Sequence, residues 1–253
     1  SHFDQHVVSL LELFKIPYTG CSPKGLTLAR DKALSKKIFT YHNMFCPNFF
    51  TFHKNRPVNL DSDLKFPMFV KSLTEEASYG ISQASLVKSH DKMKERINYL
   101  INELETDVIA EEFIEGRELF VGIIGNKNLT TFPVWELVFS NSQTPEKEFY
   151  SSSAKFNDNY RKRNGILTQK AILNPSLESK IIEVAKLTYK VLELDGYARI
   201  DLRVTSENNI YILEANPNPD IAKDDEFALS ADEYGMNYSE LLQKILTLGI
   251  NKT

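Results

Sequence analysis

The sequence is poor in cysteine and has no long apolar run. Its two cysteines, Cys21 and Cys46, lack the spacing of metal ligands and are too few for a disulfide framework. We therefore expect reduced thiols in a cytoplasmic protein. No apolar stretch approaches the roughly 18 residues that a membrane-spanning helix requires, so a membrane is not an expected partner.

An excess of positive charge is also missing. The 253 residues include 30 Lys and Arg against 34 Asp and Glu, which gives a net charge of −4. Nucleic-acid binding depends on clustered Lys and Arg, so nucleic acid is not an expected partner either. The five histidines are scattered, and a histidine metal site is not expected. The 42% of hydrophobic residues is ordinary for a globular protein and supplies one large or two modest cores.

The most informative part of the chain is the pair of segments GYARIDLRV and IYILEANPNPD. In the first, apolar residues alternate with Arg199, Asp201 and Arg203, which predicts a β-strand with one polar face. The second is also strand-like, being rich in β-branched and aromatic residues. The polar link Ser206–Asn209 has the length and residue types of a hairpin turn.

A turn symmetric about Glu207–Asn208 places Asp201 opposite Glu214, and Arg199 opposite Asn216. Directly opposed carboxylates repel each other, so a cation between them is expected to stabilise the pair. Asp201, Glu214 and Asn216 offer only oxygen ligands, which favours Mg²⁺ over Zn²⁺. The alternative is a polar hairpin face that points at water. The two prolines that follow favour a ligand site, because they end the strand and stiffen its end.

Three other segments carry groups suited to a nucleotide. Lys71 ends an apolar strand and precedes a loop with Ser78 and Gly80, a combination that suits a phosphate. Glu111, Phe113 and Ile114 could surround a flat heterocycle, Glu118 could accept from ribose hydroxyls, and Lys155 lies in a basic loop that could close over phosphates. Each segment, taken alone, also fits an ordinary strand end or a charged surface loop.

The order of expected elements predicts an α/β (α+β) fold with two subdomains and a break near Thr106. Helical spacing from Leu26 to Phe45 predicts one helix there. The polar stretch from Asn141 to Gly165 has no period and predicts a long loop. A cleft between two subdomains is a favoured place for a ligand.

Together these segments resemble the ATP-grasp superfamily, and most closely the D-alanine–D-alanine ligase-like carboxylate–amine ligases. The resemblance covers nearly the whole chain and rests on LLELFKIPYTG, ARDKALSKK, FPMFVKS followed by GIS, IAEEFIEGRELFVGIIGN, SSSAKF, GYARIDLRVT and IYILEANPNP. It implies two α/β subdomains that grip ATP, at residues 31–106 and 107–253. Residues 1–30 resemble the tail of the family's N-terminal domain.

The resemblance also implies roles for single residues. It assigns Lys32 and Lys71 to ATP phosphates, Ser78 and Gly80 to a lid-like loop, Glu111, Phe113 and Ile114 to adenine, Glu118 to ribose, Lys155 to the γ-phosphate, Arg199 to the transferred phosphate, and Asp201, Glu214 and Asn216 to two Mg²⁺ ions, with Mn²⁺ as an alternative. The implied substrates are a small-molecule carboxylate and an amine, as amino acids or peptides. A homodimer is compatible with the resemblance.

The implied reaction forms an amide or peptide bond through an acylphosphate and releases ADP and phosphate. After the metal asparagine the family carries a Pro-Gly turn and a serine that binds the carboxylate of the second alanine. This chain carries Pro217–Asp220 and then the acidic run Asp224–Glu226. That departure predicts a basic or amine-bearing second substrate in place of D-alanine. The alternatives are a non-catalytic ATP-binding module on the same fold and a small-molecule kinase.

Overall fold

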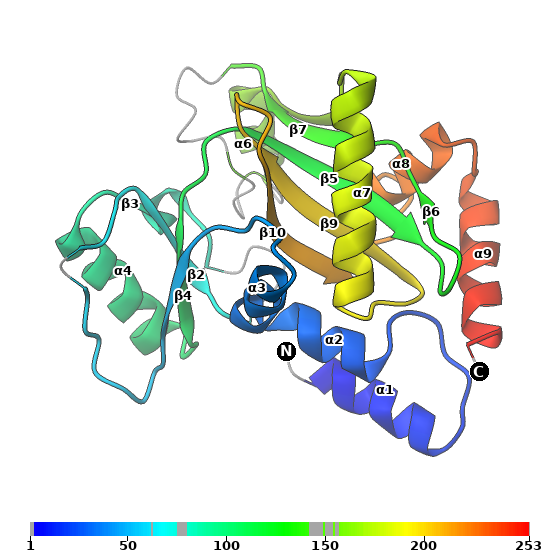
Figure 1. The fold of residues 1–253 in the computed structure, drawn as a ribbon, viewed down its shortest axis with the longest axis horizontal. Helices are drawn as coiled ribbons and strands as arrows, with labels where there is room; N and C mark the ends of the chain where they lie inside the picture. Colours follow the sequence, from blue (N-terminus) through cyan, green and yellow to red (C-terminus); the bar gives the residue numbers. More distant parts are fainter. Residues whose placement is uncertain are drawn as a thin grey trace.

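The computed structural model describes residues 3–61, 63–74, 80–141, 149, 154 and 157–252, and two antiparallel sheets organise them (Figure 1). The helices and strands are α1 (Phe3–Leu13), α2 (Pro23–Arg30), α3 (Lys32–Tyr41), β1 (Phe49–Phe52), β2 (Met68–Ser72), the 3-10 helix η1 (Gln83–Ser85), β3 (Leu86–Val87), α4 (His90–Glu103), β4 (Val108–Glu112), β5 (Arg117–Ile124), β6 (Thr130–Thr131), β7 (Trp135–Phe139), α6 (Asp158–Asn164), β8 (Ile166–Lys170), α7 (Pro175–Val191), β9 (Tyr197–Val204), β10 (Ile210–Pro217), α8 (Glu226–Glu233) and α9 (Tyr238–Ile250).

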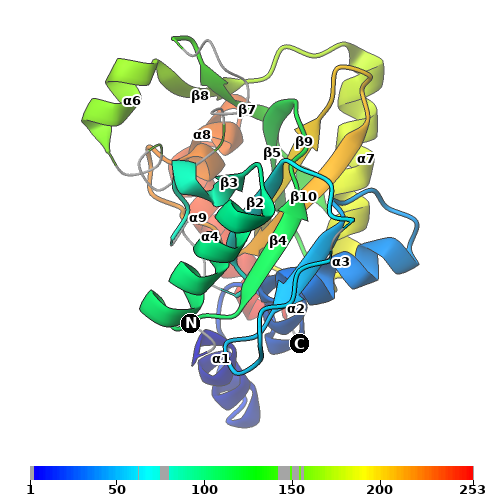
Figure 2. The same ribbon diagram turned by 90° about the vertical axis from the view of Figure 1, so that its left-hand side faces the viewer.

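The smaller sheet has the strand order β1-β4-β2-β3. Alternate apolar residues of β2 and β4, such as Val70 and Ala110, pack against Met93 and Ile97 of α4. Figure 2 shows α4 in front of this sheet. Side chains alternate across a strand, so Lys71 of β2 and Glu111 of β4 point to the opposite face. That face is turned toward the rest of the molecule.

The larger sheet has the order β10-β9-β5-β7-β8, with β6 paired to β5. One face buries Leu119, Ile200 and Leu202 against Ile181 and Ala185 of α7. Figures 1 and 2 show α7 on this face and α8 and α9 on the other side. Because β9 is covered on both sides, its polar alternate residues are buried as well as its apolar ones.

The division between the sheets falls after β4, later in the chain than the break expected near Thr106. β4 pairs with β1 and β2, so it belongs to the smaller sheet. The crossing to the larger sheet therefore lies between Glu112 and Arg117. Local sequence pattern marks β4 as a strand but does not say which strands it joins. The division into residues 1–30, 31–106 and 107–253 remains a prediction.

Two expected elements differ from those observed. The single helix expected from Leu26 to Phe45 is two helices, because Asp31 is extended and its carboxylate accepts the backbone N–H of Ala33 and Leu34. Such a side chain starts a new helix. The loop expected from Asn141 to Gly165 contains α6, which ends where Gly165 takes a left-handed conformation with φ 59°.

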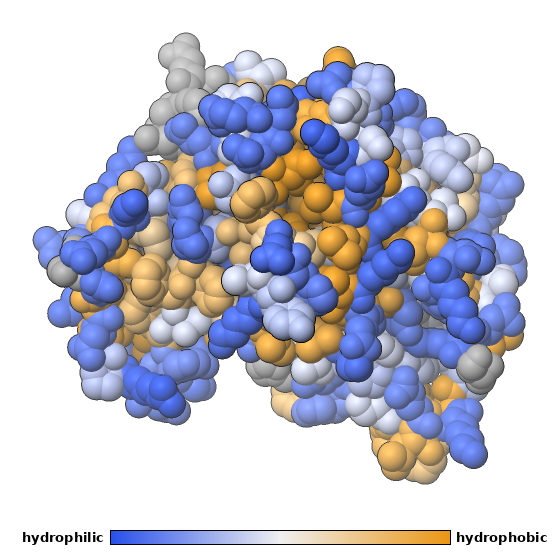
Figure 3. All heavy atoms as spheres, viewed as in Figure 1, coloured by the Kyte–Doolittle hydropathy of each residue, from blue (hydrophilic) through white to orange (hydrophobic). Residues whose placement is uncertain are grey.

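Helix α1 presents an apolar stripe to the surface. None of its residues, all of them described, is buried, and Phe3, Val7, Leu10 and Leu13 are 54–79% exposed. Figure 3 shows orange side chains at the lower edge of the molecule, where α1 lies in Figure 1. Among the described helices none combines the length and apolarity that would let it cross a membrane.

Truncation of Ile181 beneath the larger sheet tests the core. Ile181 is fully buried in α7, so Ile181→Ala removes buried methyl groups and leaves a cavity. We expect the free energy of unfolding to fall by about 2–5 kcal/mol in urea titrations. The matched control is Ile172→Ala, since Ile172 is 84% exposed, and its expected change is within about 0.5 kcal/mol. Equal effects of the two substitutions would contradict this core assignment.

Candidate active site

The β9–β10 hairpin has the expected pairing at its polar end, but not near its turn. Asp201 faces Glu214 and Arg199 faces Asn216, as predicted. Near the turn, however, Val204 pairs with Ile210, one residue away from the expected register. A β-bulge between Ile212 and Glu214 shifts the register and brings the two carboxylates opposite each other.

Asp201 is buried and held from two sides. Arg199 donates two hydrogen bonds to its carboxylate, from Nε at 2.8 Å and from Nη2 at 2.9 Å. Asn216 donates a third from Nδ2 at 3.0 Å. Arg199 also lies 4.9 Å over the ring of Phe120, and its Nη1 lies 3.5 Å from Oε2 of Glu226. The guanidinium therefore has a defined position between two carboxylates and an aromatic ring.

Two lysines from other elements converge on Glu214. Its Oε2 lies 3.8 Å from Nζ of Lys32 on α3 and 3.9 Å from Nζ of Lys71 on β2. Lys71 also lies 3.1 Å from Oε2 of Glu111 on β4. The structure thus brings together the two predicted phosphate lysines and a predicted metal carboxylate, although they come from distant parts of the chain.

The charges around the two opposed carboxylates are unequal. Burial raises the pKa of Asp201 and outweighs the opposite effect of Arg199. Burial also opposes ionisation of Glu214, but Lys32 and Lys71 dominate and hold the pKa of Glu214 below its ordinary value. Burial lowers the pKa of Lys71, yet Glu111 and Glu214 outweigh it and the net shift is upward. Glu214 and Lys71 are therefore both charged near neutral pH.

The donor atoms available for a cation are carboxylate and amide oxygens. In the part of the chain that the structure describes, no three His, Cys, Asp or Glu side chains form a metal-binding group. Asp201, Glu214 and Asn216 supply two carboxylates and one amide from adjacent strands. Such a set fits a hard cation that shares its coordination with substrate phosphates.

Aromatic rings line the region expected for the nucleoside. Phe113 stacks on Phe69 with ring centroids 6.4 Å apart, and Phe149 meets Phe69 edge-on at 5.0 Å. Arg203 lies 5.6 Å over Phe113 and donates from Nη2 to the carboxylate of Glu118. Its Nη1 donates to the carbonyl of Ile114 at 3.4 Å. The predicted residues Phe113, Ile114 and Glu118 therefore form one neighbourhood.

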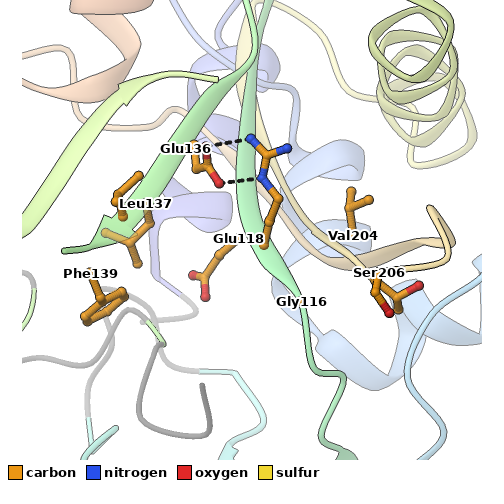
Figure 4. Close-up of a pocket in the computed structure, with 10 residues that line it drawn as sticks. Gly116, Glu118, Glu136, Leu137, Phe139, Val204 and Ser206 are labelled. Atoms are coloured by element: carbon orange, nitrogen blue, oxygen red, sulfur yellow. Dashed lines mark hydrogen bonds and ion pairs between the residues drawn. The ribbon is translucent and has the colours of Figure 1, made fainter. Parts of the chain in front are cut away.

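A cavity of about 350 Å³ opens beside Glu118, between the ends of β5, β7 and the hairpin (Figure 4). In Figure 4 the Glu118 carboxylate points away from Glu136, which is paired with Arg117 by two hydrogen bonds of 2.6 and 2.7 Å. Leu137 and Phe139 provide apolar surface in the same cavity. A carboxylate beside apolar groups suits the sugar of a nucleotide.

The roles predicted for Ser78, Gly80, Glu111 and Lys155 stay predictions. Ser78 and Lys155 lie outside the described residues. Gly80 is described, has φ 73°, and its carbonyl accepts from Arg96. The carboxylate of Glu111 forms ion pairs with Lys36 and Lys71, and its expected contact with adenine stays a prediction.

The sequence motifs and the geometry of this site agree with the similarity of the chain to known proteins. Residues 37–247 match the protein family described as D-ala D-ala ligase C-terminus. The chain is 31% identical over 255 residues to the D-alanine–D-alanine ligase of Carboxydothermus hydrogenoformans. The matched region covers 98% of this chain and 77% of that protein. The chain belongs to the D-alanine–D-alanine ligase-like family. Its members have the ATP-grasp fold, and this ligase is an ATP-dependent, ADP-forming carboxylate–amine ligase.

A second relative and a solved structure agree with this family assignment. The D-alanine–D-alanine ligase of Aquifex aeolicus is 32% identical over 244 residues, which are 96% of this chain and 77% of that protein. The crystal structure of the Bacillus anthracis D-alanine–D-alanine ligase complexed with ATP superposes with a TM-score of 0.79 at 24% identity. It covers 97% of this chain and 74% of that chain, and it supports the fold.

The sequence prediction gave no site role to Lys36 or Arg203, and it included Glu226 only as part of the acidic run Asp224–Glu226. Lys36 follows Lys32 by one helical turn, a spacing that places both on one face and could have been noticed. Arg203 continues the alternation of Arg199 and Asp201, so its face was predictable but its partner was not. Nothing in the local sequence indicates that Glu226 reaches Arg199.

Proposed function

We propose that the ligase forms an amide or peptide bond through an acylphosphate, with two Mg²⁺ ions and with an amine substrate other than D-alanine. The observation that carries the proposal is the convergence of Lys32, Lys71 and Arg199 on the paired Asp201 and Glu214. Such an arrangement suits a triphosphate and its ions, because cations and carboxylates alternate around one point.

The proposed roles follow from position. Lys32 and Lys71 bind phosphate oxygens, and Asp201, Glu214 and Asn216 hold the ions. The ions neutralise charge on the phosphates when bound. Arg199, oriented by Asp201, stabilises the phosphoryl group during transfer to the substrate carboxylate and then the tetrahedral centre after amine attack. Lys155 is expected to approach the γ-phosphate from its loop.

The nucleoside is proposed to lie in the neighbourhood of Phe69 and Phe113. The two rings offer apolar faces for adenine, with Glu111 and Ile114 beside them. Glu118 is proposed to accept hydrogen bonds from the ribose, with Arg203 holding its carboxylate in place. Ser78 and Gly80 are proposed to cover the phosphates.

The proposal of a different amine rests on Glu226. This buried carboxylate lies 3.5 Å from Nη1 of Arg199, so Arg199 already faces an anion on that side. A second carboxylate from an amino acid would be repelled there, whereas a basic group would be attracted. We therefore expect amines with a second positive charge to be better acceptors than D-alanine.

A screen of amino acids, diamines and small peptides for ATP-dependent phosphate release tests this function. ADP and free phosphate with a new amide are the expected products, and basic amines are expected to give the fastest release. Asp201→Ala and Glu214→Ala are the inactive controls. A phosphorylated product would instead indicate a kinase, and ATP binding without turnover of any pair would indicate a non-catalytic module. Turnover with D-alanine and with no other amine would contradict the proposed acceptor.

The proposed assembly is a homodimer in the cytoplasm. Sedimentation equilibrium of the ligase tests the dimer, and a mass of one chain at micromolar concentration would contradict it.

A further inference from the structure

Lys36 is a fully buried lysine at the junction of the two sheets. Its side chain has no exposed surface. Its Nζ donates to the backbone carbonyl of Leu213 on β10 at 3.1 Å and lies 3.3 Å from Oε1 of Glu111 on β4. An ammonium group is costly to bury, so both contacts compensate a large desolvation penalty.

The contact with Leu213 falls on the β-bulge of the hairpin. Ile212 pairs with Leu202, but the next pair joins Glu214 to Asp201, so Leu213 is the extra residue. Without the bulge, the register near the turn would place Leu213 opposite Asp201. Lys36 thus binds the backbone at the residue whose displacement sets the carboxylate pair.

Lys36 and Lys71 share the carboxylate of Glu111. Oε1 lies near Lys36 and Oε2 lies 3.1 Å from Lys71. Because Lys36 shares this charge, Lys71 is not the only counterion of Glu111 and also stays within 3.9 Å of Glu214. Burial holds the pKa of Lys36 below its ordinary value, and Glu111 offsets part of this shift.

We propose that Lys36 is a positioning residue of the ligase, which fixes the bulge at Leu213 and shares Glu111 with Lys71 so that Glu214 is held in place to bind metal. The inference rests on the proposed function, since it takes Asp201, Glu214 and Asn216 as the metal ligands. Lys36 itself reaches no substrate, because its ammonium group is enclosed by protein.

The test is metal binding by Lys36→Met, which keeps a long side chain but removes its charge and its donor. Mn²⁺ binding is followed by electron paramagnetic resonance, with an ATP analogue that cannot be hydrolysed. We expect the Mn²⁺ dissociation constant to rise by about tenfold or more, since groups that orient metal ligands commonly contribute this much. The control is Met93→Ala, which truncates a fully buried side chain of α4 in the smaller sheet's core. We expect it to lower the thermal midpoint without changing the Mn²⁺ dissociation constant.

Unchanged Mn²⁺ binding by Lys36→Met, with a lowered thermal midpoint, would overturn the inference and leave Lys36 a purely structural residue. If Lys36→Met does not fold, Lys36→Gln decides: weakened Mn²⁺ binding supports the role, and wild-type binding overturns it. If the wild-type ligase with the analogue binds no Mn²⁺, the proposed metal site itself fails, and this role fails with it. The two failures are therefore distinguishable. If wild type and Lys36→Met bind Mn²⁺ equally well, only the role of Lys36 is overturned.

Discussion

Replacement of Arg199 by methionine is expected to lower kcat about a thousandfold, because an arginine that faces a transferring phosphoryl group contributes roughly this factor or more. Methionine keeps much of the side-chain length but has no charge and no N–H donors. The structure orients this guanidinium by two hydrogen bonds to Asp201 and by the ring of Phe120. Initial rates of phosphate release at saturating ATP, with the best amine from the screen, measure the effect.

The matched control is Arg117→Met on the neighbouring strand β5. Arg117 also makes two hydrogen bonds to one carboxylate, that of Glu136, but it alternates with Glu118 and so points to the opposite face of the sheet. Its loss is expected to leave kcat within about twofold, because the Arg117 side chain is directed away from the face that carries Arg199 and Asp201. Equal loss of activity in both variants would show that activity depends on the total positive charge of the sheet and not on the position of Arg199.

Replacement of Glu214 by glutamine is expected to reduce kcat/KM for ATP by about a thousandfold. The change keeps the shape of the side chain and removes the charge that binds metal and faces Lys32 and Lys71. Several kcal/mol of charge stabilisation depend on a bound ion, and about 4 kcal/mol corresponds to this factor. Steady-state rates over a wide range of Mg²⁺ concentration measure the loss, and raised Mg²⁺ is expected to recover part of it.

Glu233→Gln is the control for the second experiment. Glu233, the last residue of α8, forms an ion pair at 2.8 Å with Lys170 of the edge strand β8, and both side chains are exposed. Asp201→Asn is expected to behave like Glu214→Gln, because the two residues face each other. Wild-type kinetics of Glu214→Gln at low Mg²⁺ would contradict the assignment of Glu214 as a metal ligand.

The sequence predicted the site best where chemistry and local pattern coincide. Alternation along GYARIDLRV put Arg199 and Asp201 on one face, and the opposition of Asp201 to Glu214 is confirmed. The reasoning behind that opposition was partly wrong, since the turn closes in a different register and the bulge at Leu213 restores the pairing. Lys36, which lies outside the hairpin, donates to the backbone carbonyl of Leu213 at this bulge. Two-residue periodicity cannot reveal it.

By itself, the sequence determined the kinds of residue available, the existence of most strands and helices, and the family to which the order of motifs belongs. These depend on side-chain chemistry and on contacts within a few residues. Only the tertiary structure decided that β4 joins the smaller sheet, that Lys36 and Lys71 share Glu111, and that Glu226 reaches Arg199. Each of these arrangements joins residues that are distant in the chain. Their geometry follows from how whole elements pack, since burial of one charge is tolerated only where folding brings an opposite charge to it.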